Sequence, residues 1–212
     1  MKLFGKIIAA SAAIFLLMST TAQAQSGSSL LDKTFASVGA GLNACILHPT
    51  QPKTWGNVGF ATDINVGIRW NPYISNRLGF HGGWNNCAQD LDLLDVEAGT
   101  SFGFKYLHAD ILCNLTNTIL GEENTGIWDA SVYAHTGAVK LSGSRTLFSK
   151  GTTTWGGGLG LLNEIKVCKE VYVTIDLQAI VANPSSFDSN GGRMVVFPTG
   201  TVGVCFNLGE IF

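Results

Sequence analysis

Hydrophobic and polar residues alternate along two long segments of the chain. From Phe60 to Trp70 almost every even-numbered position is apolar, and the odd-numbered positions are small or polar. From Val171 to Val181 the odd-numbered positions are apolar, and Ile180 is the one large aliphatic residue on the opposite face. A period of two over this length predicts β-strands with one apolar and one polar face.

Six further segments repeat this pattern and complete a set of eight. They are Thr34–Ile46, Arg77–Asn85, Ala98–Asn114, Ile127–Leu141, Thr152–Lys166 and Met194–Phe212. Their connections alternate between two short turns (71–76 and 167–170) with a third connection longer than a simple turn (115–126), and loops that are longer on average (48–59, 86–97, 142–151 and 182–193). An even number of strands joined in this way predicts an all-β fold, an eight-stranded antiparallel up-and-down transmembrane β-barrel with its long loops outside the cell.

One predicted strand is irregular. In Ala98–Asn114, Phe102 and Phe104 fall in phase with His108 and Asp110. We therefore expect a β-bulge near Lys105 that shifts the register of this strand.

Residues 1–24 have the features of a secretory signal peptide. Lys2 and Lys6 precede the apolar run Ile7–Met18, and Ala22-Gln23-Ala24 provides a small-x-small cleavage site. The alternative of an uncleaved anchor is disfavoured because a spanning helix needs roughly 20 apolar residues. We expect residues 25–212 to form one outer-membrane β-barrel domain.

Alternation alone does not separate a membrane barrel from a soluble β-sandwich or lipocalin-type barrel, since only the direction of the apolar face differs. Here the ionisable residues lie well inside the strands, with Gly and Ala between them, which predicts a lumen packed with paired charges. The expected interior polar network consists of Asp63, Arg69, Arg77, His81, Lys105, His108, Asp110, Asp129, His135, Glu164 and Asp176. The alternative is a soluble periplasmic β protein.

Four tryptophans favour the membrane interpretation. Trp70 and Trp128 lie in the apolar phase near the shorter turns, and Trp84 and Trp155 lie in the apolar phase near the longer loops. This distribution is typical of two aromatic girdles at the membrane–water interfaces.

Composition narrows the remaining choices. The net charge of −2 and the charged fraction of 13% provide no basic surface for nucleic acid. The five cysteines form no CxxC pair, which argues against a zinc site. Bridges between Cys45 and Cys87 and between Cys113 and Cys168 are alternatives to free thiols, and Cys205 is expected to be a small interior residue.

The last predicted strand ends in an aromatic residue. Val204, Phe206, Leu208 and Phe212 share a phase, a pattern that barrel-assembly machinery recognises in outer-membrane proteins, so we expect this strand to be the assembly signal.

Three short blocks resemble a known family. The segment Tyr106–Asn117 resembles the fourth strand and following turn in the N-terminal barrel of the outer membrane protein A family. Asn71-Pro72-Tyr73 with Arg77-Leu78-Gly79, and Gly160-Leu161-Leu162-Asn163, resemble other parts of that barrel. The resemblance implies a stand-alone barrel in the cell envelope of a Gram-negative bacterium, without the peptidoglycan-binding domain that such proteins usually carry.

Few groups of residues in the sequence are candidates for catalysis or for binding a metal or a phosphate. His108, Asp110 and His135 fit a metal site or a catalytic pair, but paired polar residues are expected inside such a barrel. Ser131 and His135 share the inward phase, whereas lipid-modifying barrels need a His with a nearby Ser at the lipid face. The run Gly156–Gly160 lacks the following lysine of a phosphate loop. We predict no catalytic residue, cofactor or metal.

The expected function is therefore a structural or surface-interaction role, with a small porin-like channel and a lipid-modifying enzyme as alternatives. Expected partners are outer-membrane lipids and lipopolysaccharide, the assembly machinery, and molecules outside the cell that bind the long loops. The loop residues expected to matter most are Trp55, Asp90, Asp92, Asp95, Arg145, Phe148, Phe187 and Arg193.

Overall fold

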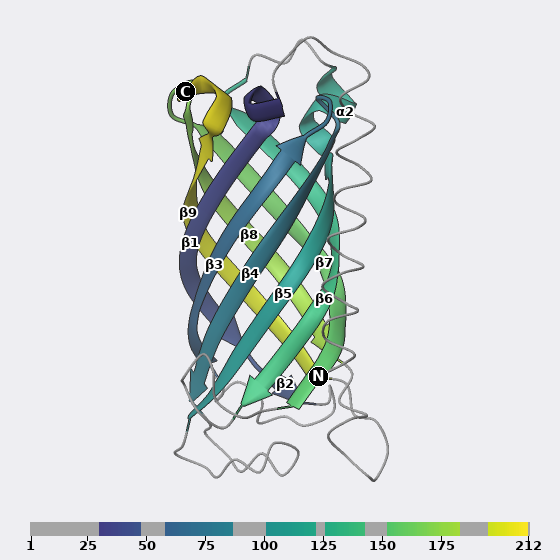
Figure 1. Cartoon of the computed structure of the whole chain (residues 1–212), viewed down its shortest axis with the longest axis vertical. Coiled ribbons are helices and arrows are strands. Elements are labelled where there is room, and N and C mark those ends of the chain that lie inside the picture. The colour runs from purple at the N-terminus through teal and green to yellow at the C-terminus, as the bar shows by residue number, and fades with distance from the viewer. Residues whose placement is uncertain are drawn as a thin grey trace.

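A single antiparallel sheet closes on itself to form the molecule (Figure 1). The computed structural model describes residues 30–47, 58–86, 101–121, 126–142, 152–182 and 195–211. The elements are η1 (Leu30–Lys33), β1 (Thr34–Ala44), β2 (Ile46–Leu47), β3 (Val58–Arg69), β4 (Ile74–Asn86), β5 (Ser101–Asn114), α2 (Leu115–Leu120), β6 (Trp128–Ser142), β7 (Thr152–Lys166), β8 (Val171–Ala182), β9 (Val195–Asn207) and η4 (Leu208–Glu210).

Each strand pairs with its sequence neighbour in antiparallel register, and β1 pairs with β9 to close the sheet. The two-residue β2 continues β1 beyond Cys45 and also pairs with β9. With β1 and β2 counted as one strand, the described residues form a closed eight-stranded antiparallel barrel, which confirms the predicted fold class. Closure satisfies the hydrogen bonds of every strand edge, as a membrane requires.

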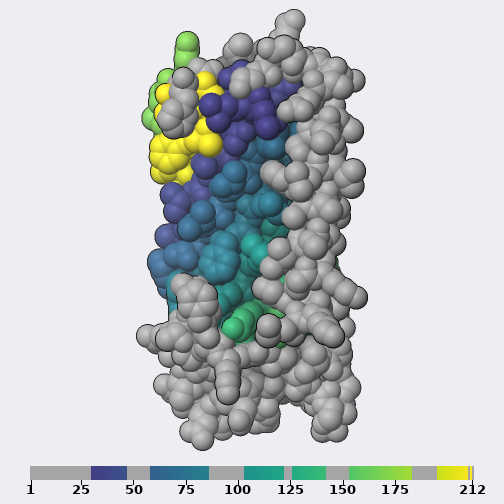
Figure 2. All heavy atoms as spheres, viewed as in Figure 1, coloured from purple at the N-terminus to yellow at the C-terminus, as the bar shows by residue number. Residues whose placement is uncertain are grey.

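The apolar face of the sheet points outward. Leu42, Ile64, Leu159 and Val202 are 63%, 58%, 71% and 60% exposed, while the polar residues of the opposite phase are buried in the lumen. In Figure 2, the purple and blue atoms of β1, β3 and β4 cover much of the coloured outer wall, with yellow atoms of the C-terminal segment beside them at the upper left. A soluble barrel would bury this apolar face, so the outward belt is arranged for a hydrocarbon environment.

The shorter connections gather at one end of the barrel, the upper end in Figure 1, together with η1, α2 and η4. In the β3–β4 turn, Asn71 Oδ1 accepts hydrogen bonds from the backbone N–H groups of Tyr73 and Ile74, both at 2.8 Å. The β5–β6 connection contains α2, which the sequence did not predict. No helix among the described residues has the length and apolar composition to cross a bilayer.

The predicted bulge near Lys105 is wrong. The register of β5 with β4 runs without interruption from Ile74↔Cys113 to Asn86↔Ser101, and its register with β6 is equally regular. Lys105 therefore stands in the outward phase, directly opposite Lys140 on β6, and the residue is 6% exposed. Phe104 takes the inward position and is fully buried.

The predicted last strand is too long. β9 ends at Asn207, whose backbone N–H donates to the carbonyl of Glu170 at 2.8 Å, and Leu208 belongs to η4 instead of the strand. Gly209 lies so close to η1 that a Cβ there would be 2.1 Å from Asp32 Cα. This packing of η4 on η1 redirects the chain. Leu208 therefore leaves the strand alternation of Val204 and Phe206, and Phe212 lies outside the described residues.

Candidate functional site

An ion-pair cluster crosses the middle of the lumen. Arg77 of β4 pairs through Nε with Asp110 of β5, and its second guanidinium nitrogen lies 2.8 Å from Asp176 Oδ2 of β8. The Tyr133 hydroxyl of β6 donates to Asp176, and the guanidinium carbon lies 4.4 Å from the centroid of the Tyr133 ring. These four side chains are buried, so one arginine balances two carboxylates away from solvent.

Two histidines extend this cluster. His108 Nδ1 lies 2.5 Å from Asp110 Oδ1, and His135 Nδ1 lies 2.8 Å from the Tyr106 hydroxyl. The other ring nitrogens face different walls, because His108 Nε2 abuts Gly79 of β4 and His135 Nε2 abuts Gly158 of β7. No three metal-ligating side chains converge in the part of the chain that the structure describes. The two histidines therefore belong to the buried hydrogen-bond network of the lumen.

A second polar group lies at the turn end of the lumen. Arg69 is 2.8 Å from Glu164 Oε1, also donates to Asn207, and lies over the Phe35 ring at 4.5 Å. Asp129 accepts a hydrogen bond from Asn114 Nδ2 at 3.3 Å. The polar members of this group line a cavity of about 170 Å³, and Phe35 does not.

The loop half of the lumen is different, because apolar side chains dominate there, beside the buried amides of Asn43 and Asn85. Phe104 and Phe197 stack there with ring centroids 4.3 Å apart. The members of this apolar layer are Cys45, Phe104, Tyr106, Val139, Leu141, Ile180, Ala182, Val195 and Phe197. We expected a polar lumen throughout. The signals that pointed to this layer were Ile180 on the polar face and the phase of Phe104.

Asp63 and His81 also lie in the lumen, where they are register partners on β3 and β4. Asp63 accepts a hydrogen bond from Asn65 at 2.9 Å, and Gln178 contacts His81 Nδ1 at 3.2 Å. Of the residues assigned to the interior network, all except Lys105 therefore occupy inward positions. They form the Arg77 cluster with its two histidines, the Asp63 and His81 contacts, and the turn-end group around Arg69 and Glu164.

The pair Ser131 and His135 also points inward, and both side chains are buried. A lipid substrate on the outer wall would not reach them.

The four tryptophans occupy the two ends of the outer wall. Trp70 and Trp128 lie at the turn end, at the end of β3 and the start of β6, and Trp84 and Trp155 lie towards the loop end of β4 and β7. Trp128 and Trp155 are exposed, and Trp84 stacks on Phe60 with ring centroids 6.2 Å apart.

Cys45 and Cys205 are buried in the lumen, and Cys113 and Cys168 are exposed free thiols at the turn end. The bridge considered between Cys113 and Cys168 is therefore not formed, and the alternative between Cys45 and Cys87 stays a prediction. Cys87 lies outside the described residues, as do residues 1–24 and the loop residues Trp55, Asp90, Asp92, Asp95, Arg145, Phe148, Phe187 and Arg193.

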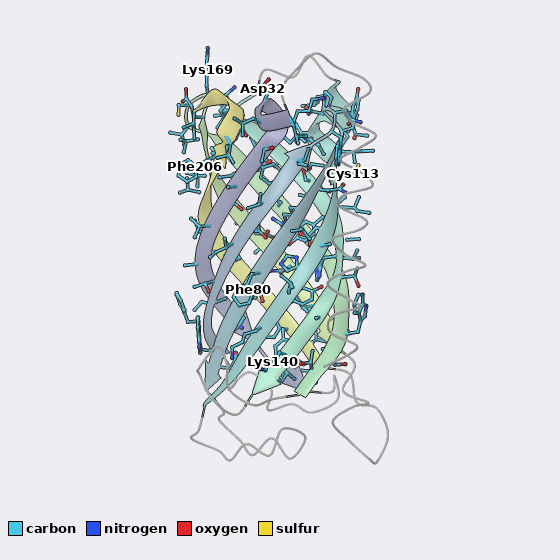
Figure 3. All side chains as sticks on the ribbon, in the orientation of Figure 1. Asp32, Phe80, Cys113, Lys140, Lys169 and Phe206 are labelled. Atoms are coloured by element: carbon cyan, nitrogen blue, oxygen red, sulfur yellow. The ribbon has the colours of Figure 1, made fainter. Side chains whose placement is uncertain are left out.

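Figure 3 shows the side chains on the barrel, with Phe206 among those at the turn end and Lys140 towards the loop end.

With this geometry in place, comparison with solved structures identifies the fold. The Neisserial surface protein A structure matches with a TM-score of 0.59 at 13% identity, covering 82% of this chain and 96% of that one. Two other solved structures also match. Ail of Yersinia pestis has a TM-score of 0.45 at 12% identity, covering 82% of this chain and 97% of that one. The N-terminal barrel of Pseudomonas aeruginosa OprF has a TM-score of 0.42 at 8% identity, covering 82% of this chain and 97% of that one.

No protein-family model matches the sequence, and no curated protein is similar to it. The comparisons establish the fold: the chain resembles the eight-stranded outer-membrane barrels of the outer membrane protein A type, as the three sequence blocks indicated.

Proposed function

We propose that this chain is an outer-membrane barrel with a structural and surface-interaction role, and that it neither conducts solutes nor catalyses a reaction. The observation that carries the proposal is the filling of its lumen. The Arg77 cluster and the stacked Phe104–Phe197 pair occupy successive levels of the same narrow cylinder. An interior of eight strands is just wide enough for such side chains.

The lumen filling argues against a porin-like channel. A solute would have to pass the apolar layer and then break the ion pairs of Arg77, which lie in a low-dielectric interior where separated charges are costly. The inward direction of Ser131 and His135 likewise argues against a lipid-modifying enzyme. Function is then left to the outer wall and to the loops.

Conductance in planar lipid bilayers tests the proposal. The purified full-length chain, refolded and checked by the heat-modifiable band that folded barrels give in gels, is added to one side of the bilayer. We expect no steady single-channel current. A reproducible unitary conductance that scales with salt concentration would refute the proposal and favour the channel.

Loop trimming tests where the interactions lie. The four segments 48–57, 87–100, 143–151 and 183–194 are each replaced by a short turn. We expect the trimmed chain to fold, because the strands close through β1 and β9 and the lumen contacts of the described residues lie outside the four replaced segments. If trimming abolishes the heat-modifiable band, the barrel and the loops are not separable and this part of the proposal is wrong.

Two further partners belong to the proposal. The outward apolar belt supports the proposal that outer-membrane lipids and lipopolysaccharide surround the barrel. Val204 and Phe206 remain in phase on β9, which supports this strand as the segment that the assembly machinery recognises.

A further inference from the structure

The connection between β5 and β6 exposes more apolar surface than a turn in water should. Ile119 is 76% exposed, the highest value among large hydrophobic side chains in the described part of the chain, and Leu120 and Ile127 reach 68% and 70%. Trp128, the next residue after Ile127, is also exposed. We call Ile119, Leu120, Ile127 and Trp128 the β5–β6 turn patch.

The helix α2 turns its polar side towards the barrel. Thr116 is buried, and its hydroxyl accepts a hydrogen bond from the backbone N–H of Ala130 at 2.8 Å. Asn117 Nδ2 donates to the carbonyl of Pro72 at 2.8 Å, in the neighbouring turn. Asn114 Oδ1 caps the helix by accepting from the Asn117 N–H at 2.8 Å. The anchoring contacts are therefore polar, and the apolar residues are left outside, the reverse of an amphipathic helix on a soluble protein.

The apolar side of α2 continues the lipid-facing belt. Cys113 is outward and exposed on β5, Leu115 follows in the same phase, and Ile119 lies one helical turn beyond Leu115. On the next strand, Trp128 begins the outward phase opposite Ile165. The patch thus extends the belt past the ends of the strands without an intervening polar zone.

We propose that the β5–β6 turn patch is an interfacial anchor that inserts into the glycerophospholipid leaflet at the turn end of the barrel. This inference rests on the proposed membrane barrel, because only a membrane meets a patch continuous with the belt. Aliphatic side chains beside an indole ring suit the boundary between acyl chains and headgroups. The anchor fixes how deeply this side of the barrel sits.

Methyl and amide NMR of the isotope-labelled full chain in phosphatidylcholine nanodiscs tests the anchor. One sample contains a phospholipid with a nitroxide near the top of its acyl chain, and another contains a water-soluble gadolinium chelate. We expect the methyl signals of Ile119 and Leu120 to lose most of their intensity to the nitroxide lipid and to keep it with the chelate. The amide of Lys169, exposed in the β7–β8 turn, should show the opposite response.

Ile111 on the belt separates the two possible failures. If Ile111 responds to the nitroxide lipid but the patch responds only to the chelate, the anchor is refuted while the membrane barrel stands, and the patch becomes a docking surface for a water-soluble partner. If Ile111 also responds only to the chelate, the membrane barrel itself is refuted.

A variant pair provides a second measurement that does not depend on one signal. Ile119→Ser combined with Leu120→Ser should expose the α2 amides to the chelate while the strand amides keep their protection. Thr118→Ser, an exposed change in the same helix, should leave the response as in the unmodified chain. Equal responses from the two variants would overturn the anchor.

Discussion

Replacing Arg77 with methionine measures how far the charges in the lumen stabilise the barrel. The side chain is 2% exposed and is the guanidinium partner of both Asp110 and Asp176, whose side chains are 0% and 6% exposed. Breaking a buried pair by removing one member costs about 3–5 kcal/mol, because the remaining charge is left without a partner. Asp110 keeps His108 and Asp176 keeps the Tyr133 hydroxyl, so we expect the lower end, about 3 kcal/mol. That is a loss of roughly 10²-fold in the ratio of folded to unfolded chains.

Urea titration in lipid vesicles, followed by the heat-modifiable band and by tryptophan fluorescence, provides the free energy of unfolding. A triple variant that adds Asp110→Asn and Asp176→Asn to Arg77→Met removes the stranded charges and should recover most of the loss. Lys169→Met, in the exposed β7–β8 turn, is the control and should change the free energy of unfolding by less than about 0.5 kcal/mol. A loss below about 1 kcal/mol for Arg77→Met, or no recovery in the triple variant, would refute the view that paired charges stabilise the lumen.

Three further changes test other parts of the structure. Phe104→Ala removes the stacked ring of the apolar layer and should destabilise the barrel by about 3–5 kcal/mol in the same urea assay; a smaller change than 1 kcal/mol would show that the layer is loosely packed. Gly158→Ala places a Cβ 1.9 Å from a backbone carbonyl of β8 and should cost about 1–3 kcal/mol or block folding, whereas Gly82→Ala, whose Cβ would be 3.4 Å from its nearest neighbour, should be tolerated. In the folded protein a small maleimide should modify Cys113 and Cys168 and leave the buried Cys205 unmodified until urea unfolds the chain; mass spectrometry counts the adducts, and rapid modification of Cys205 would contradict its burial.

The strands could be predicted from sequence because their pattern is local. The range of β7, Thr152–Lys166, agrees with the prediction, and β8 differs by one residue at its end. In both strands the side chains alternate between lipid and lumen, and polar or small residues mark the ends. Such signals do not depend on what lies across the barrel.

The register of β5 could not be predicted because it depends on contacts across the lumen. We assigned apolar residues to the lipid face, so Phe104 in phase with Asp110 required a bulge at Lys105. In the structure Phe104 stacks on Phe197, a residue more than 90 positions away in sequence, and the strand needs no irregularity. The assumption of a uniformly polar lumen produced both the false bulge and the misplaced lysine.

Two of the three short helical elements at the turn end, α2 and η4, were missed for a related reason. η4 forms where Gly209 approaches η1, and α2 is fixed by the hydrogen bond that Thr116 accepts from β6 and by the one that Asn117 donates to the β3–β4 turn. Each depends on a segment distant in sequence. Neither leaves a period that a single sequence reveals, since both are shorter than two helical turns.

The division of the lumen into an apolar and a polar layer bears on where function resides. The apolar layer separates the Arg77 cluster from the loop end of the barrel, and less water around the cluster strengthens each of its ion pairs. Desolvation of these charges is tolerated because each carboxylate has an opposing cation or a hydrogen-bond donor. A lumen built in this way behaves as the core of the protein, and its buried charges stabilise one packing. Under the proposed function, recognition depends on the surfaces outside this core, namely the lipid belt, the β5–β6 turn patch and the long loops.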